Sequence, residues 1–163
     1  MSTAHAMKSA DVSVKVILCP TDFSPGAEPA LAWASVLSRT FGAEMVILHV
    51  LDLSLGALAG LPSEMAMVPA VEQLAGRVRA EATESMSRLA ARFPQARTTI
   101  REGRPRATIL DAAAEVHADM IVMGTHGRTG LSHVFFGSVA EHVVRHSPIP
   151  VLTVRQSDDD PAQ

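Results

Sequence analysis

The stretch Met120-Ile-Val-Met-Gly-Thr-His-Gly127, followed after nine residues by Gly137-Ser138, decides the fold of this chain. An apolar run leads directly into a glycine-rich segment, and a helical pattern then occupies 139–146. Glycine-rich turns and helix N-termini present backbone N–H groups and the positive end of the helix dipole. The stretch therefore predicts a strand, an anion-binding turn and a helix, with a phosphate as the natural ligand. The alternative is that these glycines only make turns.

Two other apolar runs have the length of a strand and lie earlier in the chain, at 14–19 and 45–50. Runs without alternation are typical of strands that helices cover on both faces, as in a parallel sheet. Residues 97–101 alternate polar and apolar side chains, which is typical of an edge strand. The segment 151–155 is the last predicted strand.

Four helical patterns separate these strands. The first begins at Ser24, a predicted N-cap, with Pro25 at the first helical position, and ends at Gly42. Apolar residues at steps of three and four mark the second helix, which Pro94 stops. The four predicted helices occupy about 24–41, 70–93, 105–116 and 138–146.

This alternation of strands and helices predicts an α/β fold: a single-domain, doubly wound, five-stranded parallel sheet with four helices. Right-handed crossovers favour the flavodoxin-like (Rossmann-like) order 3-2-1-4-5. The first and fourth strands then become neighbours where the winding reverses, and ligands bind beyond the carboxyl ends at that point. These ends are 19–22 and 123–124. The glycine segment thus lies where the topology predicts a ligand.

The length of 163 residues suits one domain, which we expect at 13–155, with a flexible N-terminus at 1–12 and a flexible acidic tail at 156–163. Cys19 is the single cysteine, so an intrachain disulfide is excluded and a reducing compartment is indicated. We expect it to be an inert core residue.

Charge and hydropathy exclude other classes. A net charge of -3 and a pI near 6.1 give no basic face for nucleic acid. Membrane insertion is not expected, because no apolar run reaches the roughly 18 residues that span a bilayer. The N-terminus lacks the apolar region of a signal peptide. We therefore expect a cytoplasmic protein.

Candidate ligand contacts follow from this placement. Backbone N–H groups of 127–138 and the Ser138 hydroxyl would hold a phosphate, with His126, Arg128 and Thr129 adding side-chain contacts. If Ser24 caps the first helix, Asp22 can face the crevice as a base, a ribose acceptor or a carboxylate on the magnesium side. The alternative is that Asp22 merely caps that helix.

Other motifs predict little chemistry. The glycine segment is neither a Walker A loop nor a G-x-G-x-x-G fingerprint, and no G-x-S-x-G elbow exists. His142 and His146 are four residues apart on one predicted helix, but Val143 stands where a zinc protease has glutamate. We interpret the pair as solvated histidines near a helix C-terminus and predict no metal ligand in the protein.

Three segments together resemble the universal stress protein family: Pro20-Thr-Asp-Phe-Ser24, the strand ending His49-Val50, and the motif G-x2-G-x9-G-S from Gly124 to Ser138. The resemblance covers 13–155, and the complete glycine motif is similar to that of the ATP-binding branch. It implies a fold of the type described above, homodimers and at most slow ATP hydrolysis.

The resemblance also implies an ATP site, with Mg²⁺ accompanying the nucleotide. The resemblance implies that Pro20, Asp22 and Val50 frame the adenine and ribose, and that the glycine motif surrounds the ribose and phosphates. The predicted ATP-binding residues are Pro20, Thr21, Asp22, Val50, Met123, Gly124, His126, Gly127, Arg128, Gly137, Ser138 and Val139.

The last strand predicts a dimer independently of the resemblance. Val151, Leu152 and Val154 on a sheet edge would form an exposed apolar ladder, and antiparallel pairing with the same strand of a second copy, through 151–155, would cover it. Residues 51–69 are expected to form an ordinary loop, with an apolar lid over the nucleotide as the alternative.

Three hypotheses of function result. The first is a nucleotide-responsive regulatory homodimer in the stress response, acting on an unknown protein partner. The second is an ATPase or phosphotransferase, for which Asp22 and His126 are available but the loop contains no lysine. The third is an interaction module without any nucleotide role.

Overall fold

The computed structural model describes residues 13–54, 68–125 and 137–156. Its centre is a five-stranded sheet in the order β3-β2-β1-β4-β5, and all neighbouring strands are parallel. The strands are β1 (Val16–Thr21), β2 (Glu44–Leu51), β3 (Arg97–Glu102), β4 (Met120–Gly124) and β5 (Val151–Val154). The predicted order and the predicted edge position of the polar strand are both confirmed.

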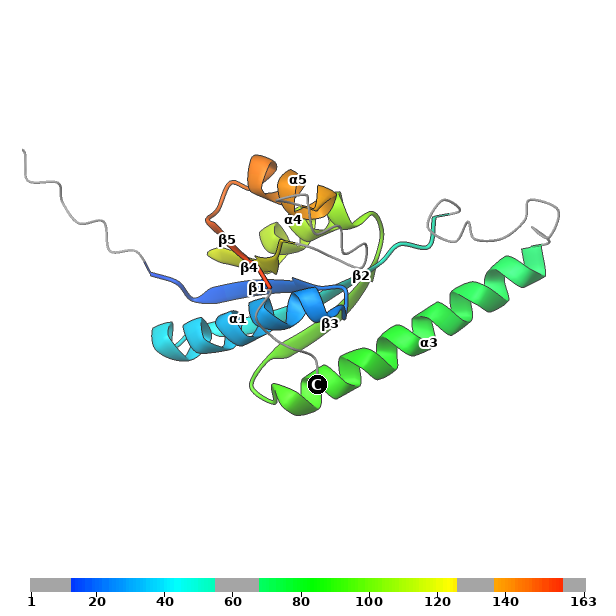
Figure 1. Cartoon of the computed structure of the whole chain (residues 1–163), viewed down its shortest axis with the longest axis horizontal. Helices are drawn as coiled ribbons and strands as arrows, with labels where there is room; N and C mark the ends of the chain where they lie inside the picture. Colours follow the sequence, from blue (N-terminus) through cyan, green and yellow to red (C-terminus); the bar gives the residue numbers. More distant parts are fainter. Residues whose placement is uncertain (1–12, 55–67, 126–136, 157–163) are drawn as a thin grey trace, which may run out of the picture.

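Helices cover both faces of this sheet. Within the described ranges they are α1 (Glu28–Phe41), α3 (Val68–Arg92), α4 (Pro105–Glu115) and α5 (Ser138–His146), with a short 3-10 helix, η1 (Pro25–Ala27). α1 and α3 lie on one face, and α4 and α5 lie on the other (Figure 1). The sequence of β1 explains this layering, because successive side chains alternate between the two faces: Ile17 and Cys19 pack under α1, and Leu18 packs under α4.

The beginning of α1 differs from the prediction. The chain first makes the 3-10 turn η1, and α1 begins only at Glu28. Ser24 precedes η1 as predicted, but its side chain makes no capping hydrogen bond. Its hydroxyl donates instead to Asp22 Oδ1 at 2.6 Å. The hydroxyl forms a charge-assisted hydrogen bond with this carboxylate, so the prediction that the Ser24 side chain caps the helix is wrong.

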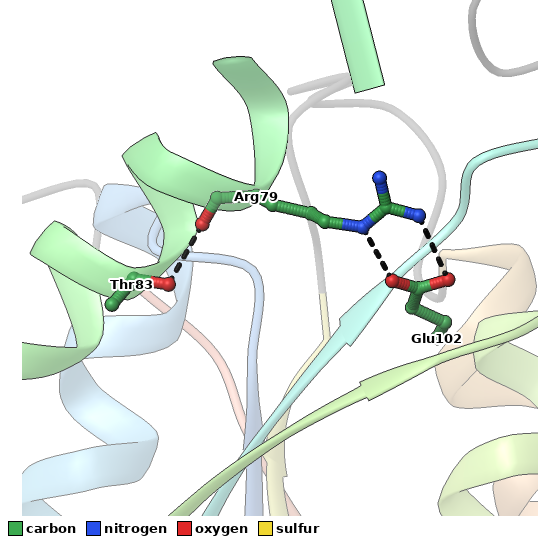
Figure 2. Close-up of polar contacts among 3 residues, drawn as sticks. All are labelled: Arg79, Thr83 and Glu102. Atoms are coloured by element: carbon green, nitrogen blue, oxygen red, sulfur yellow. Dashed lines mark hydrogen bonds and ion pairs between the residues drawn. The ribbon is translucent and has the colours of Figure 1, made fainter. Parts of the chain in front are cut away.

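The long helix α3 is attached to the edge of the sheet by an ion pair. Arg79 Nε and Nη2 donate to the two carboxylate oxygens of Glu102, at 2.6 Å and 3.2 Å (Figure 2). Glu102 ends β3, so this fork joins the middle of α3 to the carboxyl edge of the sheet. Both side chains are about half exposed, and such pairs orient elements more than they stabilise them.

Burial is deepest at the centre of the sheet. Residues 45–49 of β2 are all buried, as a strand covered on both faces requires. Cys19 is fully buried beside them, and desolvation raises its pKa to about 12. A thiol that stays protonated at neutral pH is neither a nucleophile nor a ready ligand, which agrees with the inert core role expected for Cys19.

One carboxylate ties the start of β1 to the start of β4. Asp119 Oδ2 accepts the backbone N–H groups of Lys15 at 2.7 Å and Val16 at 3.0 Å, and Val16 O accepts the Asp119 N–H at 2.9 Å. The two backbone hydrogen bonds lower the pKa of Asp119. The ionised carboxylate therefore stabilises the folded state.

We predict that Asp119→Ala lowers the melting temperature by a few degrees at pH 7. Because the folded pKa is depressed, the stabilising contribution of Asp119 is present above its unfolded pKa of about 3.9 and is lost as the pH falls through the folded value. The melting temperatures of the two proteins should therefore converge as the pH is lowered from 5 to below the unfolded pKa. A gap of the same size across that range would show that the ionised form is not what stabilises the fold.

Among the described helices, none is both long and apolar enough to cross a lipid bilayer.

Candidate functional site

A cavity of about 310 Å³ opens at the carboxyl ends of β1 and β4, where the winding of the sheet reverses. This is the position that the topology predicts for a ligand. The volume is at the lower end of the range for small-molecule pockets. The residues that line it are Pro20, Thr21, Asp22, Leu48, Val50, Pro105, Ile109, Met123, Gly124, Thr125, Gly137, Ser138, Val139 and Ala140.

One side of the cavity is apolar. Leu48 and Val50 lie two residues apart on β2 and so share one face of the sheet, and Met123, near the end of β4, belongs to the same buried cluster as Leu48. Pro105 and Ile109, from the first turns of α4, line the cavity as well. Aliphatic walls without charges suit a flat, weakly polar group such as a nucleobase.

The N-terminus of α5 also lines the cavity. Gly137 is the N-cap, in an extended conformation, and as a glycine it has no side chain to cap the helix. The first intrahelical hydrogen bond is from Glu141 N–H to Gly137 O at 2.9 Å, so the N–H groups of 138–140 precede it. These three residues line the cavity. Their N–H groups and the helix dipole favour an anionic ligand group on this side.

A hydrogen bond joins this helix start to the end of β4. Gly137 N–H donates to Thr125 O at 2.7 Å, and Thr125 N–H donates to Val154 O at 3.0 Å. The backbone on both sides of the segment 126–136 is thereby held against the sheet. The position of the N-cap relative to the cavity is fixed by the strands rather than by α5 alone.

Asp22 belongs to a tight turn at the mouth of the cavity. Its Oδ1 accepts the Ser24 N–H at 3.0 Å and the Ser24 hydroxyl at 2.6 Å, and Thr21 Oγ1 accepts the Phe23 N–H at 3.1 Å. The turn holds the carboxylate at the cavity in a defined orientation. Its negative charge suits hydroxyl donors, such as those of a ribose, better than phosphate oxygens.

The buried side chain of His49 contacts this turn at Phe23 and Thr21. Phe23 has a left-handed backbone (φ 62°), which is strained for a bulky residue. Its ring lies 4.2 Å from the ring of His49, centroid to centroid. His49 is buried, and its Nδ1 donates to Thr21 O at 2.7 Å. The two contacts stabilise the strained turn that carries Asp22.

If the cavity binds ATP, as the family resemblance implies, His49→Ala is expected to weaken that binding about tenfold, a loss of about 1.4 kcal/mol, because the turn relaxes and Asp22 leaves its position. His49→Asn should retain most of the affinity, since its amide NH₂ can replace the Nδ1 donor. The affinity for 2′,3′-dideoxy-ATP, measured by calorimetry, should change little in either variant. Equal losses for ATP and the dideoxy nucleotide would mean that His49 supports the fold in general and does not position Asp22.

Nine of the twelve predicted ATP-binding residues line the cavity together, and His126, Gly127 and Arg128 lie outside the described residues. Thr129 also lies outside the described residues, together with the expected flexible N-terminus 1–12, all but the first residue of the expected tail 156–163, and most of the loop 51–69. Five lining residues were not predicted: Leu48, Pro105, Ile109, Thr125 and Ala140. Leu48 was detectable, because it lies two positions before Val50 on the same strand face.

His142 and His146 are absent from the cavity lining. Their rings stack at 4.1 Å between centroids, and His146 Nδ1 donates to His142 O at 2.8 Å. His146 is exposed near the end of α5, which matches the interpretation of a solvated pair near a helix C-terminus. In the part of the chain that the structure describes, no three His, Cys, Asp or Glu residues cluster as metal ligands.

Comparison with known proteins agrees with this geometry. The model of the universal stress protein family matches residues 13–155. Universal stress protein MJ0531 of Methanocaldococcus jannaschii is 34% identical over 143 residues, which are 87% of this chain and 82% of that protein. Universal stress protein MJ0577 of the same organism is 31% identical over 162 residues, with 90% and 98% covered.

Solved structures show the same architecture. The structure of MJ0577 has a TM-score of 0.78 at 30% identity and covers 90% of this chain and 99% of its own. A universal stress protein from Archaeoglobus fulgidus, solved in complex with dAMP, shares the fold with a TM-score of 0.58 at 23% identity, covering 88% and 99%. By its sequence, its sheet order and these matches, the chain belongs to the universal stress protein family.

Proposed function

We propose that this protein binds ATP, with Mg²⁺, in the cavity between β1 and β4 and acts as a nucleotide-responsive regulatory homodimer in the stress response. One observation carries the proposal: one cavity at the switch point is lined both by aliphatic side chains and by the N-terminus of α5. A base and a polyphosphate need these two environments at the two ends of one site.

The residues present fit a nucleotide. The base would lie against Val50 and Ile109, the ribose hydroxyls would donate to Asp22, and the phosphates would accept N–H groups at Ser138 and Val139. Mg²⁺ would be held chiefly by phosphate oxygens and water, as is usual for this ion. The A. fulgidus relative, solved with dAMP, is consistent with an adenine nucleotide as the ligand.

The decisive test is calorimetric titration of the full chain with ATP and Mg²⁺, with GTP and with tripolyphosphate. ATP should bind more tightly than either, because only ATP uses both sides of the cavity. Adenine nucleotide should also be found by mass spectrometry in protein that is purified without added nucleotide. No heat of binding at millimolar ATP would refute the proposal and favour an interaction module without a nucleotide role.

The rate of ATP hydrolysis distinguishes a nucleotide-responsive regulator from an enzyme. We expect at most slow hydrolysis, a few turnovers per hour, because Asp22 is held by Ser24 and serves to orient the nucleotide. An ATPase or phosphotransferase would instead reach rates of about 1 per second or more. Steady-state phosphate release, or phosphate transfer to an added protein, distinguishes the two.

We further propose that the dimer forms through β5. This strand ends the sheet at the side opposite β3, and its Leu152 side chain is 36% exposed. An unpaired apolar edge is an aggregation risk that antiparallel pairing with a second copy would remove. The bound nucleotide would then bias how this dimer meets its protein partner, since the N-cap Gly137 of the helix that faces the phosphates is hydrogen-bonded to Thr125, whose N–H donates to Val154 O of β5.

A further inference from the structure

The exposed large apolar side chains come from β5 and from two helices that contact it. Among the described residues, the large hydrophobic side chains that stay exposed are those of Trp33, Val36, Phe41, Val144 and Leu152. They come from α1, α5 and β5 only. These three elements meet at the β5 edge of the sheet, where α1 and α5 both contact β5. The other edge, at β3, carries the Arg79–Glu102 ion pair described above.

Three of the apolar residues of α1 form a stripe toward this edge. One flank of α1 faces α3, because Glu28 pairs with Arg92 at 2.7 Å. Trp33, Leu37 and Phe41 recur at steps of four along the opposite flank. With α3 on one side and β5 on the other, this flank is the one directed to the β5 edge. Trp33 is 51% exposed and Phe41 is 49% exposed; we call these three residues the α1 stripe.

The edge strand continues the apolar surface. Val154 packs in the core under α1, whereas Val151 packs against the core under α4 and α5. Side chains alternate along a strand, so Leu152 shares the face of Val154. Leu152 therefore lies on the α1 side of the sheet, at its edge, next to the α1 stripe.

The surface area that a stable dimer must bury indicates which molecule covers the α1 stripe. Two four-residue strands, each about 13 Å long, supply only a minor part of the roughly 1,200 Å² that a specific interface buries. Tryptophan and phenylalanine bury about 150–250 Å² each when they are covered. Pairing of β5 with a second copy thus buries less area than a specific interface needs. The exposed aromatic side chains beside β5 could supply the missing area.

We infer that the second copy of this chain covers the α1 stripe, so that Trp33 and Phe41 anchor the dimer; this inference rests on the proposed pairing through β5. The two-fold axis of antiparallel edge strands passes through the sheet, so the two α1 helices lie on the same face and run in opposite directions. The stripe is centred on Leu37. The Trp33 end of the α1 stripe in one subunit thereby lies next to Phe41 of the partner subunit, above the paired Leu152 side chains.

The fluorescence of the protein tests this directly. Trp33 is the only tryptophan and the sequence has no tyrosine, so intrinsic emission reports the environment of this one side chain. At concentrations where sedimentation shows a dimer, emission should be blue-shifted and acrylamide quenching reduced. Both should revert to the values of an exposed indole as the protein is diluted through the same midpoint that sedimentation gives.

A matched pair of variants locates the contact. Phe41→Ser should raise the dimer dissociation constant about 30-fold, whereas Val36→Ser, which is equally exposed on α1 but off the stripe, should leave it within about twofold. A dimer with an exposed Trp33, or equal effects of the two variants, would overturn the inference and leave the β5 dimer in place. A monomer at all concentrations would overturn both, while ATP binding would remain a separate result.

Discussion

Val50→Trp is expected to weaken ATP binding at least about 100-fold, a loss of about 2.7 kcal/mol, without unfolding the protein. Val50 lines the apolar side of the cavity and is only half-buried, so an indole can extend from β2 into the space without displacing core atoms. In a cavity of about 310 Å³, that ring occupies the volume which the adenine would need. The phosphate side stays intact but cannot hold the nucleotide alone.

Calorimetry and thermal unfolding together check this result. Val144→Trp is the matched control, because Val144 is an exposed valine of α5 that does not line the cavity. It should bind ATP like the unaltered protein. Both variants should melt within a few degrees of it. Unchanged affinity in Val50→Trp would place the base elsewhere and remove the main support for the proposed site.

The fold was predictable because each strand carries its own signal. Buried strands of a doubly wound sheet are apolar throughout, so 14–19 and 45–50 could be recognised without knowledge of their partners. The polar alternation of 97–101 marked the edge strand, and Gly42 marked the end of α1, where it adopts the left-handed conformation (φ 64°). Strand order then followed from general rules of handedness.

From the sequence, only those candidate site residues could be predicted that lie at or next to the end of a recognisable strand. Residues directly after β1 and β4 could be assigned, since parallel strands present their carboxyl ends at one edge. Pro105 and Ile109 could not, because their place depends on how α4 crosses the end of β2, which is a tertiary fact. The start of α1 failed for a local reason: Ser24 can cap a helix or donate to Asp22, and the sequence pattern is the same for both.

Thr153→Pro is expected to raise the dissociation constant of the proposed dimer by more than about 100-fold. Pro150 O and Val154 O accept hydrogen bonds from the N–H groups of Ile121 in β4 and of Thr125, which directly follows β4, each at 3.0 Å. Backbone groups of an extended strand alternate in direction, so the N–H of Thr153 faces the free edge. Proline removes that donor but keeps an extended backbone, and edge strands tolerate it.

The two-fold symmetry doubles this effect, because each copy loses one donor and each leaves a carbonyl of its partner unpaired. Two such losses, at about 1–3 kcal/mol each, remove a large part of the binding free energy of a small interface. Thr153→Val keeps the N–H and is the control, and sedimentation equilibrium measures both. The melting temperature of the monomer should not change, since the ladder between β4 and β5 does not use the Thr153 N–H. A dimer that survives Thr153→Pro but not Phe41→Ser would mean that the α1 stripe, and not the strand edge, holds the two copies together.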